Sequence, residues 1–310
     1  MSDPDAEDDA AHDAAAEAAS DRATDADLSE RISSPDKVLW PSAQITKLDL
    51  AEYYVAVADR LLPYLAGRAT TLKHSPKGVD DDGFMRKDLP DHAPPSVGRW
   101  TTYAKSARRS LDYAVIENVD ALIWCAGQNV TEFHPCLFRV DRPDRLDTVV
   151  IDLDPSPDSV DAATTALWIR EICDQLGLAC AVKTSGGRGM HVTVPVERRY
   201  DTPRLRAFAE AIASEAVRRH PDELTTEFTK TERGGRLFVD CTRVGIGATV
   251  ISAWSPRARS EPTVSTPLEW DEVVDGLDVT RFTQSVAVDR PAADEPDPQR
   301  IERAVDALGL

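Results

Sequence analysis

The sequence predicts an α+β fold in which helices lie on one face of a sheet of short strands. Two helical segments, roughly 159–176 and 203–219, are separated by several apolar strands and not by regular strand–helix–strand units. A glycine-rich turn at 185–189 joins two of these strands into a hairpin, so the two strands run antiparallel. The arrangement is ferredoxin-like in type.

The first half of the chain begins with a helix and continues through short strands. Thr46 and Asp49 form a capping-box pattern, and apolar residues follow at helical spacing as far as Gly67. Polar turns at 75–78 and 80–83 then interrupt the strands. The other elements predicted here are strands at 69–73 and 130–140, short strands up to about residue 115, and a short helix at 118–126.

The second half carries the clearest strand signals. Residues 148–154 are rich in β-branched side chains and stop at Pro155. Gly177 ends the first of the two helices. Further strands are predicted at 178–184, 190–196, near Phe228, 236–240 and 248–254.

The 310 residues carry a formal net charge of −18, but that charge is concentrated at the ends of the chain. Residues 1–30 hold eleven acidic residues and one basic residue, and residues 271–310 hold ten acidic and four basic residues. The stretch 68–109 is net positive, so the overall charge does not exclude a nucleic-acid partner. We expect a disordered acidic tail at 1–33, a folded domain at 34–285, and an acidic C-terminal segment with a short helix at 286–310.

Composition also argues against several classes of protein. No apolar run reaches the 18 residues of a membrane-spanning helix, and the acidic N-terminus does not resemble a secretory signal. The five cysteines form no Cys-x-x-Cys motif, which favours buried reduced thiols over a zinc site. These features predict a cytoplasmic protein with no membrane partner.

Two carboxylates, Asp152 and Asp154, end the strand at 148–154. Side chains two apart on a strand point to the same face, where two carboxylates repel each other unless a cation neutralises them. Hard oxygen ligands of this kind favour Mg²⁺ or Mn²⁺. Taken alone, the pair fits two solvated or helix-capping residues somewhat better than a metal site, and the motif also occurs in sugar transferases and phosphatases.

The segment 185–191 reads Ser-Gly-Gly-Arg-Gly-Met-His. Its glycines allow backbone amides to approach an anion, Arg188 offers a fork of donors for phosphate oxygens, and His191 starts the next strand. An ordinary hairpin turn with a surface histidine is the alternative. No Gly-Lys-Ser/Thr follows, so the segment is not a Walker loop.

A third acid, Asp240, ends the short apolar strand at 236–240. Arg233 precedes this strand, and Arg257 and Arg259 follow it, so positive charge lies on both sides. Each signal is weak alone. Together, three carboxylates for two divalent cations and a basic glycine-rich loop for a triphosphate favour two-metal phosphoryl transfer.

The order of these motifs resembles the archaeo-eukaryotic primase superfamily, and most closely the polymerase domain of the bacterial ligase D proteins of non-homologous end joining. The resemblance runs from about Lys37 to Asp271 and is carried by the stretches 38–41, 149–155, 184–191, 238–240 and 254–259. It implies a primase-like catalytic core with mixed and antiparallel sheets flanked by helices. It also implies that Asp152, Asp154 and Asp240 bind two Mn²⁺ or Mg²⁺ ions.

The resemblance implies roles for residues that spacing alone would not single out. Binding of the incoming triphosphate falls to Ser185, Arg188, His191, Arg233 and Arg257, and His134 lies near the nucleotide sugar. Lys37 and Lys47 match two lysines that hold the 5′-phosphate across a gap. Phe84 and Met85 stand where two aromatic residues often stack on template bases. Met85 departs from that pattern, as Arg188 departs from a common lysine.

The implied activity is template-dependent synthesis that fills short gaps or ends in DNA repair, with a preference for ribonucleotides. The expected partners are DNA bearing a 5′-phosphate, NTPs or dNTPs, Ku and a separate DNA ligase, since no Lys-x-Asp-Gly ligase motif is present. We therefore expect a stand-alone, nucleoid-associated polymerase. The alternatives are a de novo primase, which the lysine pair disfavours, and a non-catalytic module that binds 5′-phosphorylated ends, which the acid triad disfavours.

Overall fold

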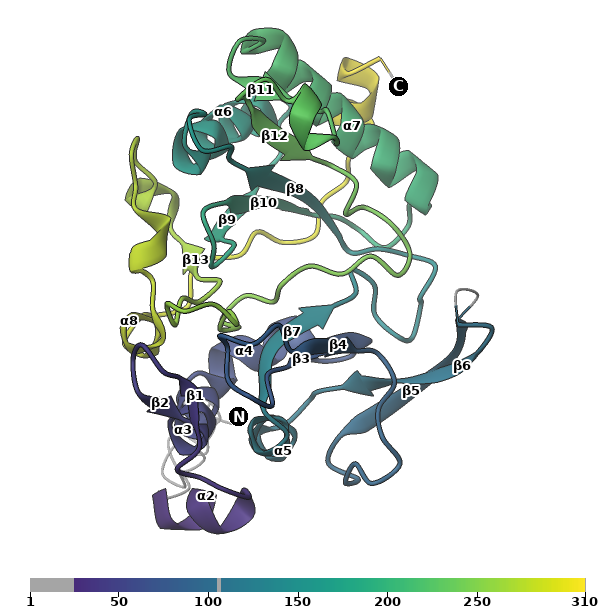
Figure 1. Cartoon of the computed structure of the whole chain (residues 1–310). Helices are drawn as coiled ribbons and strands as arrows, with labels where there is room; N and C mark the ends of the chain where they lie inside the picture. The colour runs from purple at the N-terminus through teal and green to yellow at the C-terminus, as the bar shows by residue number, and fades with distance from the viewer. Residues whose placement is uncertain (1–24, 105–106, 310) are drawn as a thin grey trace, which may run out of the picture.

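The computed structural model describes residues 25–104 and 107–309 of the chain. Its strands form a six-stranded sheet and a five-stranded sheet, which lie one above the other in Figure 1, together with a small two-stranded sheet. Each of the two large sheets has its own hydrophobic core. The prediction of mixed and antiparallel sheets flanked by helices is confirmed.

The six-stranded sheet has the strand order β11-β12-β8-β10-β9-β13 and is antiparallel except for the parallel pair β11–β12. Helices α6 (Ala162–Gln175) and α7 (Thr202–Arg219), capped by Asp161 and Asp201, cover its outer face (Figure 1). The opposite face looks toward the five-stranded sheet. The strands are β8 (Thr148–Asp154), β9 (Ala181–Thr184), β10 (Met190–Pro195), β11 (Leu224–Thr225), β12 (Leu237–Asp240) and β13 (Pro267–Leu268).

The five-stranded sheet has the order β4-β3-β6-β5, and β7 also pairs with β3. Its β5–β6 hairpin projects from the body of the molecule (Figure 1). The strands are β3 (Thr70–His74), β4 (Phe84–Arg86), β5 (Gly98–Ala104), β6 (Arg109–Val115) and β7 (Val130–Pro135). Packed with it are α3 (Lys47–Ala56), α4 (Ala58–Leu65), α5 (Val119–Gly127) and the pair β1 (Val38–Trp40) and β2 (Ile45–Thr46).

The disordered tail predicted at 1–33 is wrong for residues 25–33, part of which forms a helix. Residues 1–24 lie outside the described part of the chain. Helix α2 (Asp25–Arg31) packs on α3 and α5. Leu28 and Ile32 are buried in the core of the five-stranded sheet, at 1% and 5% exposure. These two apolar side chains, four residues apart, anchor an otherwise largely exposed segment to the neighbouring helices.

The C-terminal segment is not separate from the folded domain. Short helix α8 (Gln284–Val288) crosses the boundary predicted at 285–286, and α9 (Glu302–Ala307) buries Ala304 and Val305 in the core of the six-stranded sheet. The side chain of Gln299 exchanges two hydrogen bonds with the backbone of Ala179. The predicted short helix is present, but its segment packs against the sheet.

The described residues also form three short 3-10 turns, at Lys230–Glu232, Trp270–Glu272 and Val279–Arg281.

One predicted strand is absent from the structure, and the strand predicted near Phe228 lies slightly earlier in the chain, as β11 at Leu224–Thr225. Residues 248–254 form an irregular segment beside β7, to which the amides of Val250 and Ser252 donate hydrogen bonds, and Trp254 has a positive φ of 63° that ends any extended run. Phe228 lies in a loop after β11 and is 72% exposed. The five cysteines are free and buried, as predicted. Within the described residues, no helix is both long and apolar enough to cross a membrane.

Candidate active site

Strand register places four side chains in a row across the inner face of the six-stranded sheet. Asp240 on β12 lies opposite Asp152 on β8, which lies opposite His191 on β10, which lies opposite Lys183 on β9. Directly opposed residues of antiparallel strands project from the same face. The structure therefore brings together three residues predicted from the sequence and adds Lys183, which sequence reasoning missed.

The two carboxylates of this row, Asp240 at its end and Asp152 beside it, share one cationic group. Nε of Arg243 lies 3.3 Å from Oδ2 of Asp240 and 3.7 Å from Oδ2 of Asp152. The second oxygen of Asp152 lies 3.4 Å from Nε2 of His191, and that of Asp240 accepts hydrogen bonds from the amide and hydroxyl of Thr242. Arg243, three residues after Asp240, was also missed by sequence reasoning.

Asp154 is directed away from this pair. It is 52% exposed, and its Oδ2 accepts a hydrogen bond of 3.1 Å from Arg233, whose guanidinium lies 4.2 Å from the ring centroid of Phe238. Within residues 25–104 and 107–309, no group of three His, Cys, Asp or Glu side chains is spaced to hold a metal ion in this conformation. Asp152 and Asp240 still fit a divalent cation, because two hard carboxylate oxygens already converge on one positive group.

Burial and charge shift the protonation equilibria along the row. Burial alone would raise the pKa of Asp152, but His191, Arg243 and Lys183 outweigh it and hold this pKa below its ordinary value. The pKa of His191 is lowered by burial and by Lys183. Burial lowers the pKa of Lys183 to about 7. The row therefore favours an ionised Asp152 beside a neutral His191.

The glycine-rich loop between β9 and β10 packs too tightly for other residues. A Cβ atom at Gly189 would lie 2.3 Å from the carbonyl oxygen of Leu153, and one at Gly186, which has a positive φ, would lie 2.5 Å from Cγ of Arg257. Arg257 donates a hydrogen bond of 2.8 Å to the carbonyl of Ser185. The glycines thus bring the loop against the strand of the acids on one side and Arg257 on the other.

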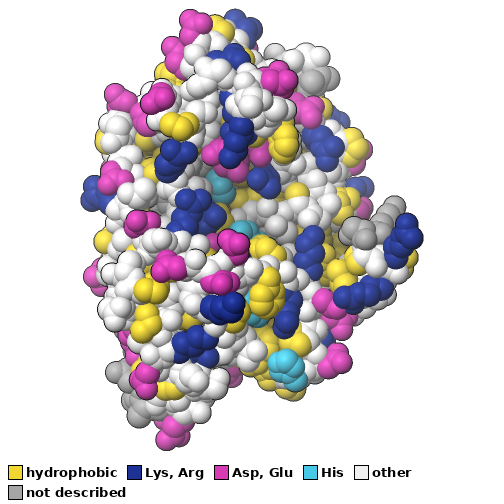
Figure 2. Space-filling model, in the orientation of Figure 1, with side chains coloured by type: hydrophobic (Ala, Val, Ile, Leu, Met, Phe, Trp, Pro, Cys, Tyr) yellow, Lys and Arg dark blue, Asp and Glu magenta, His cyan; other side chains and the backbone are white. Residues whose placement is uncertain are grey.

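Three arginines surround this loop. Arg188 extends from it and donates a hydrogen bond of 3.3 Å to the carbonyl of Pro155. Arg259 lies against Gly187, and its pKa is lowered by burial and by its neighbours Arg257 and Arg188. Figure 2 shows that this face of the molecule is hollowed between the two sheets, with Lys and Arg side chains around the hollow. Such a concentration of positive charge suits a polyanionic ligand.

The five-stranded sheet presents the remaining predicted residues. His134 on β7 contacts Glu132, with Nε2 and Oε2 2.6 Å apart. Phe84 and Met85 on the edge strand β4 are 43% and 47% exposed. One face of Phe84 stacks on His74 with ring centroids 5.1 Å apart, which fixes the orientation of its ring.

The two predicted lysines lie side by side at the start of α3. The amide of Lys47 donates a hydrogen bond of 2.8 Å to the carbonyl of Lys37. Burial, together with the charge of Lys37, lowers the pKa of Lys47. The ammonium of Lys47 donates to the carbonyls of Ser33 and Gly127, while that of Lys37 donates to the carbonyl of Pro76. The two lysines are therefore neighbours through their backbones, and the ammonium group of Lys47 also binds the N-terminal segment at Ser33.

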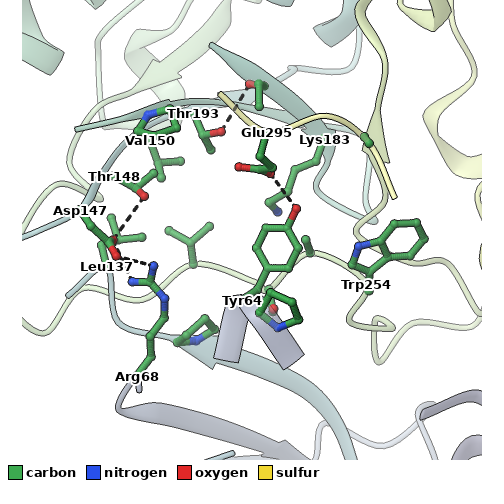
Figure 3. A pocket seen from close by; sticks show the side chains of 18 of the residues that line it. Tyr64, Arg68, Leu137, Asp147, Thr148, Val150, Lys183, Thr193, Trp254 and Glu295 are labelled. Atoms are coloured by element: carbon green, nitrogen blue, oxygen red, sulfur yellow. Dashed lines mark hydrogen bonds and ion pairs between the residues drawn. The ribbon is translucent and has the colours of Figure 1, made fainter. Parts of the chain in front are cut away.

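A cavity of about 440 Å³, lined by residues of both large sheets, is shown in Figure 3. Tyr64 and Glu295 meet in it through a hydrogen bond of 2.7 Å, and Arg68 pairs with Asp147 at 2.7 Å. Of the four residues in the row, Lys183 lines this cavity. The candidate site therefore adjoins this cavity at Lys183, and the other three residues of the row do not line it.

Residues 46–298 match the family model of the LigD primase-polymerase domain. The chain is 31% identical over 249 residues to the multifunctional non-homologous end joining protein LigD of Mycolicibacterium smegmatis, covering 79% of this chain and 32% of that one. It is 34% identical over 251 residues to the Pseudomonas aeruginosa protein of the same name, covering 78% and 29%. It is 30% identical over 263 residues to the bifunctional LigD of Bacillus subtilis, covering 84% and 42%.

Among solved structures, the polymerase domain from Mycobacterium tuberculosis ligase D in complex with DNA matches with a TM-score of 0.77 and 31% identity, covering 83% of this chain and 92% of that one. The fold and the matches place this protein among the nucleotidyltransferases of the DNA polymerase and primase type. More narrowly, the chain belongs to the family of LigD primase-polymerase domains. It spans 29% to 42% of the length of the three curated relatives named here.

Proposed function

We propose that this protein is a template-dependent polymerase that fills short gaps or ends during DNA repair and prefers ribonucleotides. The observation that carries the proposal is the pairing of Asp240 and Asp152 in register, beside a glycine-rich loop flanked by Arg188, Arg257 and Arg259. The acids would bind metal ions, and the basic loop beside them would bind a triphosphate. This combination suits transfer of a nucleotidyl group.

In the proposed reaction the primer 3′-hydroxyl oxygen attacks the α-phosphorus, the bond from that phosphorus to the β-phosphate oxygen breaks, and pyrophosphate leaves. Two bound Mn²⁺ or Mg²⁺ ions would lower the pKa of the hydroxyl and neutralise the pyrophosphate. Asp152 and Asp240 would hold them, with Asp154 after it releases Arg233. The loop around Ser185 and His191 would hold the triphosphate, together with the surrounding arginines.

The rest of the proposed substrate would lie on the five-stranded sheet. His134 would contact the sugar, and Phe84, with Met85, would support the template base. Lys37 and Lys47 would hold the downstream 5′-phosphate. We further propose that Ku and a DNA ligase complete end joining, since the curated relatives are non-homologous end joining proteins.

The test is extension of a labelled primer on a gapped duplex whose downstream strand bears a 5′-phosphate, with NTPs and dNTPs supplied separately. We expect extension that favours NTPs, requires Mn²⁺ or Mg²⁺ and stops on addition of a chelator. Dinucleotide synthesis on bare single strands without gap extension would indicate a primase. Tight binding of the gapped duplex without turnover would indicate an end-binding module. Either result would overturn the proposal.

A further inference from the structure

Glu132 is a buried carboxylate between two residues assigned to different parts of the substrate. It lies on β7 and is 6% exposed. Its Oε2 lies 2.6 Å from Nε2 of His134. Its Oε1 accepts a hydrogen bond of 2.8 Å from the amide of Ala258 and lies 3.3 Å from Nε of Arg257. Residues 132 and 134 are two apart on the strand, so their side chains project from the same face.

These contacts continue into the other sheet. Arg257 donates through its terminal nitrogen to the carbonyl of Ser185 at 2.8 Å, so a chain of polar contacts runs from His134 through Glu132 and Arg257 to the glycine-rich loop. The chain begins on the five-stranded sheet and ends on the six-stranded sheet. It is a direct polar connection between the residue proposed for the sugar and those proposed for the triphosphate.

The charge state of Glu132 determines whether it accepts or donates the hydrogen bond to His134. Burial would raise the pKa of Glu132, but His134, Arg257 and the amide of Ala258 outweigh it and lower this pKa to about 2. An ionised carboxylate only accepts hydrogen bonds, so Nε2 of His134 must carry the proton. Among the described residues, no hydrogen-bond partner is found for Nδ1 of His134. In neutral His134 that nitrogen is an acceptor for a hydroxyl group.

We propose that Glu132 is a positioning residue that couples recognition of the ribose to recognition of the triphosphate. It holds His134 with Nδ1 available to a 2′-hydroxyl donor and holds Arg257 against the loop that receives the phosphates. A 2′-deoxyribose lacks the hydroxyl and leaves Nδ1 unpaired. The inference rests on the proposed function, because it presumes a nucleoside triphosphate in this space.

The first experiment compares Glu132→Gln with wild type in kcat and KM for NTPs and dNTPs, in equilibrium binding of both, and in thermal unfolding. Glu171→Gln, on the outer helix α6, is the matched control. We expect Glu132→Gln to lower the preference for NTPs about tenfold, the size of one lost hydrogen bond to a charged partner, and to raise KM for both substrates. In a His134→Ala background, the same substitution should no longer change the sugar preference but should still raise KM.

An unchanged sugar preference in a folded Glu132→Gln protein would overturn the inference. A loss of activity that is equal for both sugars and accompanied by a lower unfolding temperature would also overturn it, because that is the signature of a purely structural role. The binding measurements need no turnover, so a failure of the polymerase proposal is visible separately from a failure of this one.

A second measurement reads the wild-type protein directly and uses a variant only to assign one signal. Nitrogen-15 shifts of the wild-type imidazoles report the tautomer of each histidine, and the His134→Ala spectrum identifies the His134 signal. We expect the tautomer protonated at Nε2. A major population protonated at Nδ1 would overturn the inference whatever the variants do.

Discussion

The two large sheets contribute to the candidate site in different ways. The six-stranded sheet presents Asp152, Asp240 and His191 from neighbouring strands, in fixed register and over a packed core. The five-stranded sheet presents its candidates from a strand edge at Phe84, from β7, and from the start of α3 at Lys47. Side chains in the first set occupy one small cluster, whereas those in the second are spread over a long surface.

This difference matches what each region is proposed to do. Chemistry requires groups held within fractions of an ångström, which adjacent strands over a packed core can provide. Contact with an extended polymer requires separated points of attachment, and exposed edges and helix starts can provide them. The projecting β5–β6 hairpin, with Arg99, Arg108 and Arg109 on it, extends the second region further (Figure 2). Substitutions of the candidate residues should therefore mainly affect the rate of the reaction in the six-stranded sheet and the affinity for DNA in the five-stranded sheet.

The largest effect is expected in the six-stranded sheet. Asp152→Asn removes one of the two carboxylates that share a cation, so kcat for primer extension should fall on the order of 10³-fold. Binding of the gapped duplex should change little, because the proposed DNA contacts lie on the other sheet. Asp174→Asn on the outer helix α6 is the control. Extension that equals wild type would refute the assignment of this sheet to chemistry.

The second effect tests the core of the five-stranded sheet. Deletion of residues 1–33 removes Leu28 and Ile32 and the Ser33 carbonyl that Lys47 binds, and should lower the free energy of unfolding by at least about 2 kcal/mol. Deletion of residues 1–24 removes eight acidic residues and one arginine, and should leave stability unchanged and DNA binding unchanged or tighter. Urea unfolding of both proteins measures this. Equal stability of the two would mean that α2 is not part of the core.

The third effect is a pH dependence that belongs to the six-stranded sheet. Burial lowers the pKa of Lys183 to about 7 in the folded protein from its ordinary value of 10.5, so between these two pH values the unfolded chain binds more protons. Stability should therefore rise with pH, by at most about 1.4 kcal/mol per pH unit for this group. Urea unfolding between pH 7 and 9 measures the slope. Lys183→Met should flatten it, and an equal slope in both proteins would contradict the burial of this ammonium group.

The smallest effect is expected at the start of the five-stranded region. Lys37→Ala should reduce the preference for gapped DNA with a 5′-phosphate over DNA without it by about tenfold, the size of one charge-assisted contact. Lys37 is the better test than Lys47, whose ammonium also binds two carbonyls. Lys77→Ala is the control, because Lys77 is 78% exposed and its ion pair is with Asp81. A matching loss in both variants would indicate only a general effect of charge.

Periodicity and turn residues predicted much of the fold. The helices at 162–175 and 202–219, the hairpin around Gly189 and the strand that ends in Asp154 all lie within a few residues of their predicted places. Each is specified by its own segment through helix caps, β-branched runs or glycines. The prediction failed for 248–254, where apolar residues are buried beside β7 with one isolated bridge at Thr249 and no continuous strand, because burial alone does not determine backbone conformation.

The sequence by itself determined the candidates for the chemistry: three acids at strand ends, a glycine-rich loop and the arginines around it. Only the tertiary structure decided which of them meet. It set Asp240 opposite Asp152, turned Asp154 to Arg233, placed Lys183 and Arg243 beside the acids, and buried Glu132 between His134 and Arg257. These contacts follow from strand order and register. Order and register depend on how segments that are distant in the sequence pack together, and no single segment encodes that packing.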